Sequence, residues 1–326
     1  MKRRLRSHVG RIAVAVLFVV VIALMVRYAR SVDWQEVGKT LTSYRPKTIV
    51  AALALVTVSY LIYCAYELAA RAHTGHGLPT RRVMLMAFIG YAFSLNLGAW
   101  VGGGGLRLRM YTRSGVRPGV VAHVAAFAVA TNWSGYLLLG GGILAGRMVR
   151  LPQSWSGGAV LGLQALGVAM LLLIAFYLYA CWRWPQRSWR IRKQELRLPS
   201  LQMALLQLAL SVVNWMVITG VVYVLMPGQV TYPELLGVLL TSAVLAAVMH
   251  IPAGLGALEG AFLVMLGGQV PKPQLLATLL AYRGFYYLLP MLLALPAYLV
   301  FEARKRKQSP KRQDAISEAE GGSSAG

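Results

Sequence analysis

The stretch SLNLGAWVGGGGLRLR, residues 94–109, places four successive glycines between an apolar run and two arginines. A second stretch, HIPAGLGALEG at residues 250–260, also follows an apolar run and also carries a charge, Glu259. Glycine weakens a helix through backbone entropy and proline removes a hydrogen-bond donor, so a smooth helix is not expected through either stretch. In a membrane, broken backbone is tolerated only where protein or a water-filled cavity satisfies its polar groups. Two such breaks in one chain indicate a transporter's substrate site.

The composition places the rest of the chain in a membrane. Of its 326 residues, 57% are hydrophobic and 13% are charged, with a mean hydropathy of +0.59, whereas a soluble domain carries about a quarter charged residues. Apolar runs of near-spanning length recur at about 48–70, 83–101, 119–145, 158–181, 201–225, 234–250, 257–268 and 274–302. These runs predict an all-α, polytopic membrane bundle of about seven to nine segments, two of them glycine-rich re-entrant or broken helices. We expect one transmembrane domain over residues 1–308 and a disordered cytoplasmic tail over 309–326.

The net charge of +23 would suggest a nucleic-acid partner in a soluble protein. Here the lysines and arginines gather in short loops and at the two ends of the chain, as membrane topology requires. Basic clusters beside a membrane attract anionic lipid head groups, by about 1 kcal/mol for each Lys or Arg. We therefore expect membrane phospholipids as partners and no nucleic acid.

Nothing in the sequence indicates a metal or a cofactor. Cys64 and Cys181 both lie in apolar runs, where we expect them to pack rather than to form a disulfide framework. His73 and His76 are spaced for one helix face, but the glycines beside them and the missing further ligands argue against a metal site. No cofactor is expected.

Loop charges predict which runs cross the membrane. The basic start and the apolar run 12–26 indicate a signal anchor, with its N-terminus in the cytoplasm. Basic loops flank 83–101 on both sides, so this segment is expected to enter and return on one side. The region 234–302 contains either a re-entrant pair and one crossing or three short crossings, and both place the C-terminus in the cytoplasm. The basic loop 29–47 would then face outward, against the rule.

Two charged residues stand inside the later apolar runs. A charge at the bilayer centre costs on the order of 3 kcal/mol, which makes Glu259 a candidate functional residue. Glu259 can also simply cap the short helix after the break, because carboxylates are stabilised at helix N-termini. Arg283 needs a partner within its run, and Glu259 is the obvious one. The guanidinium of Arg283 also suits a lipid phosphate, although a helix-end arginine can instead extend to the membrane surface.

The four glycines before Arg107 and Arg109 admit two interpretations. Backbone N–H groups of the glycines can form an anion nest that the two guanidinium groups reinforce. Alternatively, the glycines permit close helix packing and the arginines are ordinary cytoplasmic charges. Asn132, Asn214 and His250 are polar groups in apolar settings, which suits either interhelical hydrogen bonds or substrate contacts. The candidate substrate-binding residues are Gly103, Gly104, Arg107, Arg109, Asn132, Asn214, His250, Gly254, Gly256, Glu259, Arg283 and Tyr286.

At these residues the chain resembles the lysylphosphatidylglycerol synthase/flippase transmembrane family. The resemblance covers nearly the whole chain. Its most specific parts are Trp100-Val101-Gly102-Gly103, Thr131-Asn132-Trp133, Val213-Asn214-Trp215, His250-Ile251-Pro252-Ala253-Gly254 with Leu258-Glu259, and Ala281-Tyr282-Arg283 with Tyr286-Tyr287 and Pro290. The two Asn-Trp pairs and the two glycine-rich breaks also hint at an inverted repeat.

The resemblance implies phospholipid translocation as the leading function, with an anionic lipid as substrate. No soluble synthase domain follows the membrane region in this sequence, so we expect no aminoacyl transfer and no enzyme activity of that kind. One alternative is a membrane-embedded transferase acting on a lipid or polyprenyl-phosphate head group, which would normally need a carboxylate cluster. Another is an adaptor that presents lipid to a periplasmic or membrane-bound lipid-transport partner.

Overall fold

The computed structural model describes residues 34–148, 157–185, 187–191, 194–226, 228, 230–248, 254 and 256–303. The expected first helix (12–26), His250 and the expected disordered tail (309–326) lie outside this part of the chain. The helices are α2 (Trp34–Ser43), α3 (Pro46–Thr74), α4 (Thr80–Leu97), the π-helix η1 (Ala99–Leu106), α5 (Arg107–Arg113), α6 (Pro118–Ala145), α7 (Gly157–Arg183), α8 (Leu201–Leu225), α9 (Tyr232–Val248), α10 (Ala257–Leu266), α11 (Lys272–Arg283) and the π-helix η3 (Gly284–Leu288).

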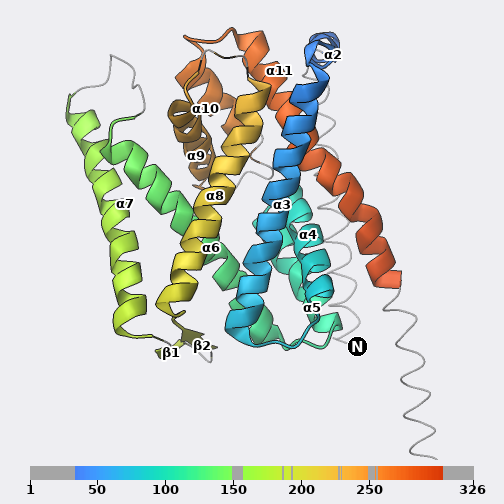
Figure 1. The fold of residues 1–326 in the computed structure, drawn as a ribbon, viewed down its shortest axis with the longest axis vertical. Helices are drawn as coiled ribbons and strands as arrows, with labels where there is room; N and C mark the ends of the chain where they lie inside the picture. Colours follow the sequence, from blue (N-terminus) through green and yellow to red (C-terminus); the bar gives the residue numbers. More distant parts are fainter. Residues whose placement is uncertain are drawn as a thin grey trace, which may run out of the picture.

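The predicted polytopic helical bundle is confirmed. Within the described residues, five helices are long and apolar enough to cross a membrane: Pro46–Thr74, Pro118–Ala145, Val160–Arg183, Leu201–Leu225 and Lys272–Ala303. They run between the two ends of the bundle in alternating directions (Figure 1). One addition was not expected: strands β1 (Ser188–Ile191) and β2 (Gln194–Arg197) form an antiparallel pair in the basic loop between α7 and α8.

Helices α3, α6 and α8 form the centre of the bundle and pack on one another, and α7 packs outside them on α6. Close approach of α6 and α8 depends on Gly135, because a Cβ there would lie 2.6 Å from the backbone carbon of Ser211. Only 11% of the most apolar window of α7 is buried, so this helix presents its side chains outward, as a lipid-facing helix does.

The first glycine-rich stretch forms one leg of a helical hairpin. Helix α4 ends at Gly98, whose φ of 85° and ψ of 159° suit only glycine. The chain then returns through η1 and α5, which pack against α4, and both α4 and α5 have their outer ends at the same end of the bundle (Figure 1). The expected break therefore falls at Gly98 rather than within the four glycines, which are helical in η1.

The second glycine-rich stretch separates the two legs of another hairpin. Helices α9 and α10 pack against each other and occupy the opposite end of the bundle (Figure 1). Two residues described at this break, Gly254 and Gly256, have φ of 59° and 84°, a backbone conformation that favours glycine. Over 234–302 the structure has two short helices, α9 and α10, followed by one long helix, Lys272–Ala303.

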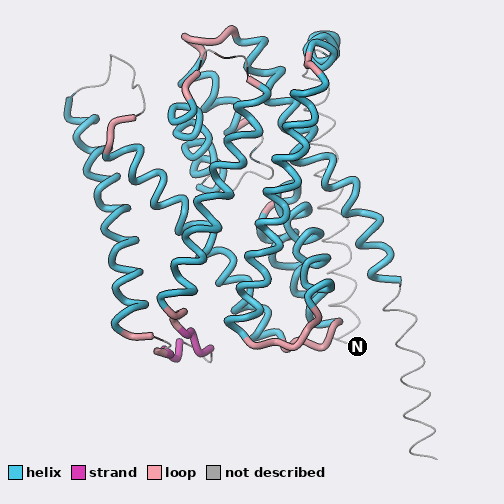
Figure 2. Tube along the Cα trace, in the orientation of Figure 1, coloured by secondary structure: helices cyan, strands magenta, loops and turns pink. Residues whose placement is uncertain are grey.

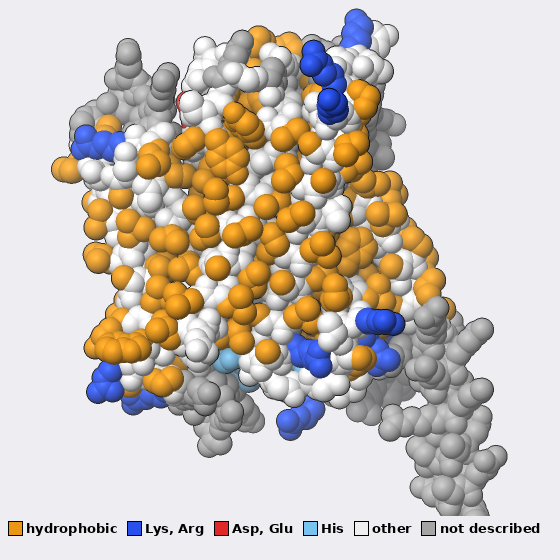
Figure 3. Space-filling model, in the orientation of Figure 1, with side chains coloured by type: hydrophobic (Ala, Val, Ile, Leu, Met, Phe, Trp, Pro, Cys, Tyr) orange, Lys and Arg blue, Asp and Glu red, His pale blue; other side chains and the backbone are white. Residues whose placement is uncertain are grey.

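The loops lie at the two ends of the bundle (Figure 2), and an apolar surface separates them (Figure 3). One end carries the loops before α4 and after α5 together with the β1–β2 pair, and we call it the basic end. Its basic residues include Arg71, Arg81, Arg82, Arg113, Arg117, Arg183 and Arg187. Helix α2 lies at the opposite end, where Lys39 and Arg45 remain exceptions to the charge pattern.

Candidate functional site

The second hairpin holds a buried ion pair. Arg283, the last residue of α11, donates from Nε to Oε1 of Glu259 at 2.8 Å and from Nη2 to Oε2 at 3.1 Å. The same Nη2 reaches the carbonyl of Gly254 at 3.2 Å, and the N–H of Gly256 donates to Oε2 of Glu259 at 2.8 Å. The side chains of Arg283 and Glu259 are only 7% and 10% exposed. The predicted pairing of Arg283 with Glu259 is confirmed, and Glu259 also caps α10.

The first hairpin holds a second buried ion pair, which the sequence analysis did not foresee. Nε of Arg107, at the start of α5, lies 2.6 Å from Oε1 of Glu67 on α3, and their side chains are 6% and 0% exposed. The hydroxyl of Tyr111 donates to Oε2 of Glu67 at 3.1 Å. The guanidinium of Arg107 lies over the ring of Tyr91, 5.3 Å from its centroid, a geometry that favours a cation–π interaction.

The two pairs share an organisation. Each joins an arginine to a glutamate, with one partner on a broken hairpin and the other on a long helix outside that hairpin. Each arginine adjoins a π-helix: Arg107 follows η1 and Arg283 precedes η3. In each pair the guanidinium faces a tyrosine ring, which for Arg283 is Tyr287 at 5.6 Å. Short π-helical segments inside helices are frequent at functional sites.

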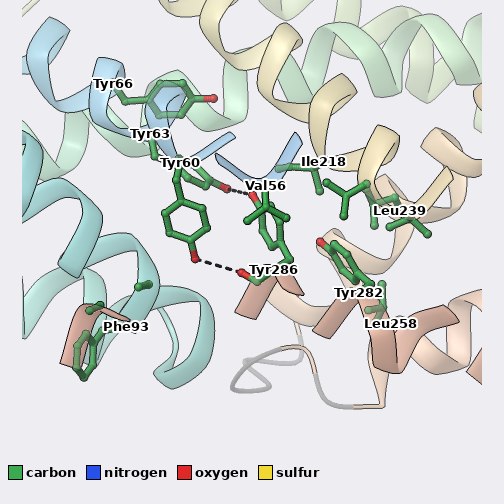
Figure 4. Close-up of a cluster of buried hydrophobic side chains, with 14 of the residues drawn as sticks. Val56, Tyr60, Tyr63, Tyr66, Phe93, Ile218, Leu239, Leu258, Tyr282 and Tyr286 are labelled. Atoms are coloured by element: carbon green, nitrogen blue, oxygen red, sulfur yellow. Dashed lines mark hydrogen bonds between the residues drawn. The ribbon is translucent and has the colours of Figure 1, made fainter. Parts of the chain in front are cut away.

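Tyrosines connect the two pairs, and Tyr63, Tyr282 and Tyr286 among them are drawn in Figure 4. Tyr91 stacks on Tyr63 with ring centroids 4.1 Å apart, and the hydroxyl of Tyr286 donates to that of Tyr63 at 3.4 Å. Tyr286 in turn stacks on Tyr282, the neighbour of Arg283 in sequence, at 5.3 Å. Together with Tyr91 over Arg107, these contacts form a continuous path from one ion pair to the other.

Asn214 and Tyr286 meet in this central layer. The hydroxyl of Ser59 on α3 donates to Oδ1 of Asn214 at 2.7 Å and lies 2.7 Å from the hydroxyl of Tyr286. Asn96 of the first hairpin donates to the carbonyl of Tyr287 at 3.0 Å. The structure thus brings these two predicted site residues together with the ion pairs, and the contact from Asn96 ties the first hairpin to the last long helix.

Two other predicted residues, Arg109 and Asn132, lie elsewhere or act differently. Arg109 is half exposed at the basic end and pairs with Glu302. It does not join Arg107 in the interior, because residues two apart on a helix point to different sides. Asn132 lies at the α6–α8 interface, where its carbonyl accepts from Ser211 at 2.9 Å and from Trp215 at 3.3 Å.

Of the two interpretations of the four glycines, close packing of helices is the one that the geometry of Gly103 supports. Gly103 and Gly104 belong to η1, and a π-helix directs its backbone N–H groups to carbonyl groups five residues earlier in the chain. A Cβ at Gly103 would lie 3.0 Å from Oγ of Ser94 on α4, so this glycine permits close packing of the hairpin's two legs.

The pairs lie at different depths. Arg283 is eleven residues from the start of the helix Lys272–Ala303, or about 17 Å from the end that carries α2. Glu67 is seven residues from the end of α3, or about 10 Å from the basic end. Taking an ion out of water costs several kcal/mol unless a partner and hydrogen bonds compensate for it. Fully paired charges within apolar helices are therefore candidate functional groups.

Fold and site together define a multi-pass helical membrane protein that holds paired charges inside its bundle at two broken hairpins. The chain belongs to the family described as the lysylphosphatidylglycerol synthase TM region, whose model matches residues 10–294. This confirms the resemblance found in the sequence and relates the chain to membrane proteins of lipid metabolism.

Two relatives cover nearly the whole chain. Inner membrane protein YbhN of Escherichia coli strain K12 is 42% identical over 300 residues, which are 92% of this chain and 94% of that protein. Uncharacterized protein slr0712 of Synechocystis sp. is 28% identical over 320 residues, which are 94% of this chain and 95% of that protein. Each similarity extends over nearly the full length of both proteins, and it supports a bacterial inner membrane protein.

Proposed function

We propose that the protein translocates phospholipids across the bacterial inner membrane, with the phosphate of the lipid head group bound by Arg283. The observation that carries this proposal is the buried, bidentate pair of Arg283 and Glu259 at the second backbone break. In the empty state Glu259 neutralises Arg283. A lipid phosphate presents the same fork of two oxygens and can take its place.

The surroundings of Arg283 suit such an exchange. When Arg283 turns to a phosphate, Glu259 keeps the N–H of Gly256 and its place in the first turn of α10, both of which stabilise a carboxylate. The break beside the pair lets backbone approach the ligand, and the carbonyl of Gly254 already holds Nη2 of Arg283. The charges of Arg283 and Glu259 therefore have partners both when the site is empty and when a phosphate is bound.

The site supports transport over chemistry on the head group. A metal-assisted transferase needs carboxylates grouped around a metal or poised for proton transfer. In this chain Glu67 and Glu259 each face an arginine. We take the basic end to face the cytoplasm, as its arginines favour. The two legs of the first hairpin then start and end on the cytoplasmic side, and those of the second on the periplasmic side. In this arrangement both hairpins are re-entrant and the C-terminus is cytoplasmic.

The proposal is tested with fluorescent phosphatidylglycerol in proteoliposomes, where dithionite bleaches only label that has reached the outer leaflet. Wild-type protein should expose inner-leaflet label faster than empty vesicles. Glu259→Gln should slow this by about tenfold or more, because the neutral amide cannot draw Arg283 back from the phosphate and one charge-assisted hydrogen bond is worth about 1.5–3 kcal/mol.

Glu302→Gln is the matched control, since Glu302 pairs with Arg109 and Arg113 at the exposed basic end. It should keep the wild-type rate. Absence of acceleration by wild-type protein with anionic and zwitterionic phospholipids alike would refute translocation. Equal rates for wild type and Glu259→Gln would remove the second hairpin from the mechanism.

A further inference from the structure

The two buried glutamates differ in what remains when their arginine leaves. Glu259 retains a backbone N–H donor and a helix N-terminus. Glu67 lies 21 residues into α3, far from that helix's N-terminus, and its remaining hydrogen bond comes from the neutral hydroxyl of Tyr111. Its side chain has no exposed surface. A carboxylate in that setting cannot stay ionised without its cationic partner, because burying an unpaired charge costs far more than neutralising it.

Arg107 follows a segment whose glycines leave the backbone few steric limits. It directly follows η1, in which four successive residues lack a Cβ, and Gly104 and Gly105 are exposed. The hairpin leg that carries Arg107 can therefore shift more readily than α3, which is a regular helix of 29 residues held between α4, α6 and α8. An anion that enters from the basic end therefore meets Arg107 on the glycine-rich hairpin leg and Glu67 on the regular helix α3.

We propose that Glu67 is a proton-binding site linked to anion binding at Arg107. When a phosphodiester takes over the guanidinium of Arg107, one proton from solvent adds to the carboxylate of Glu67, and the proton leaves when Arg107 returns. Anion and proton then enter the bundle together without a net change of buried charge. This inference rests on the proposed function in taking a lipid head group as the source of the phosphodiester.

Several helices bring ionisable groups to the surroundings of Glu67. Helix α5 contributes Arg107 and Tyr111, and α4 contributes Tyr91 together with Arg81 and Arg82 in its first turn. Its own helix α3 carries Cys64 three residues before it and Arg71 four residues after it, and η3, which packs on α3, carries Tyr286 and Tyr287. The other helices packed on α3 in the bundle centre contribute, as titratable residues, His123 and Tyr136 on α6 and Tyr223 on α8. His76, in the loop after α3, lies edge-on to Tyr111 at 5.5 Å and marks the side from which a proton would enter.

The test measures proton uptake directly. Dihexanoyl phosphatidylglycerol is titrated calorimetrically into the detergent-solubilised full chain in Tris and in HEPES, whose ionisation enthalpies differ. The probe's phosphodiester stays ionised near neutral pH, so any proton taken up belongs to the protein. We expect uptake approaching one proton per lipid bound, and an affinity that falls by up to about tenfold for each unit that pH rises.

Glu67→Gln mimics the protonated carboxyl and keeps its shape. It should bind the lipid with no proton uptake and with an affinity that no longer depends on pH, at least equal to that of wild type. Glu234→Gln is the matched control, because Glu234 is a buried carboxylate at the other end of the bundle that bonds to neutral Gln269 at 2.6 Å. His123→Gln is the control for a histidine on the neighbouring helix α6, and both controls should retain uptake.

The outcomes separate this inference from the proposed function. Binding without proton uptake in the wild type would overturn the proton site while leaving translocation open. Uptake that persists in Glu67→Gln and disappears in His123→Gln would assign the proton elsewhere and also overturn it. Uptake with dimethyl phosphate as well as the lipid supports the site for any phosphodiester, whereas uptake with the lipid alone confines it to lipid. Loss of translocation with uptake intact would refute the transport proposal only.

Discussion

Removing only the arginine of the Arg283–Glu259 pair should damage the protein far more than removing both charges. In Arg283→Met the carboxylate of Glu259, 10% exposed, loses two charge-assisted hydrogen bonds and keeps the one from Gly256. Stranding a buried charge costs about 3–5 kcal/mol of unfolding free energy. In Glu259→Gln the amide still accepts from Arg283 but lacks the charge, which costs about 2 kcal/mol.

The double variant Glu259→Gln with Arg283→Met has no buried charge left. Methionine fills much of the arginine's apolar volume, and the amide oxygen of the glutamine can accept from Gly256. We expect a loss of about 2 kcal/mol, against about 5–7 kcal/mol if the single losses added. The coupling of about 3–5 kcal/mol should appear in reversible SDS unfolding in mixed micelles, followed by circular dichroism.

The surface pair Arg109–Glu302 provides the control cycle. Its side chains are 51% and 23% exposed, so Arg109→Met with Glu302→Gln should show a coupling of about 0.5 kcal/mol or less. Additive losses at Arg283 and Glu259 would show that neither charge depends on the other, which would contradict the buried pair and the exchange mechanism built on it. Translocation should be lost in Arg283→Met and in the double variant, although the latter folds.

Two further predictions concern packing and pH. Gly135→Ala should destabilise the protein by about 1–3 kcal/mol, because the new Cβ would lie 2.6 Å from the backbone of Ser211. Gly142→Ala, on the same helix but with open space around it, should instead stabilise the protein by about 0.5–1 kcal/mol. Equal effects of the two substitutions in SDS unfolding would contradict the α6–α8 contact. Burial, and then the charge of Arg71, lowers the pKa of His76 below its ordinary value. As the pH falls, His76 is therefore protonated in the unfolded chain before it is protonated in the folded one. The contribution of His76 to the free energy of unfolding should be full above about pH 6.5 and should be lost as the pH drops below that value, so the loss should be less steep in His76→Gln. Identical profiles of stability against pH for variant and wild type would show that His76 contributes nothing.

Much of the site could be read from residue types alone. Glu259 and Arg283 stood out because a charge inside an apolar run demands a partner, and each was the nearest candidate for the other. The same rule identifies Glu67, the acidic residue within the run 48–70, but its partner Arg107 lies 40 positions away in a segment that also fits a cytoplasmic loop. Only the hairpin's return leg shows which of the neighbouring arginines turns inward.

The amino-acid sequence by itself determined the membrane, the approximate helices, the two glycine-rich breaks and the family, because apolar run length, glycine content and loop charge are local properties. Tertiary structure decided that the break falls at Gly98, that the four glycines become a π-helix, and that Arg107 is buried while Arg109 faces the surface. It also decided that tyrosines from α3, α4 and the last long helix connect the two ion pairs. These contacts depend on how the hairpins pack against the long helices. That packing decides whether a charge that loses its water gains a partner that compensates for the cost.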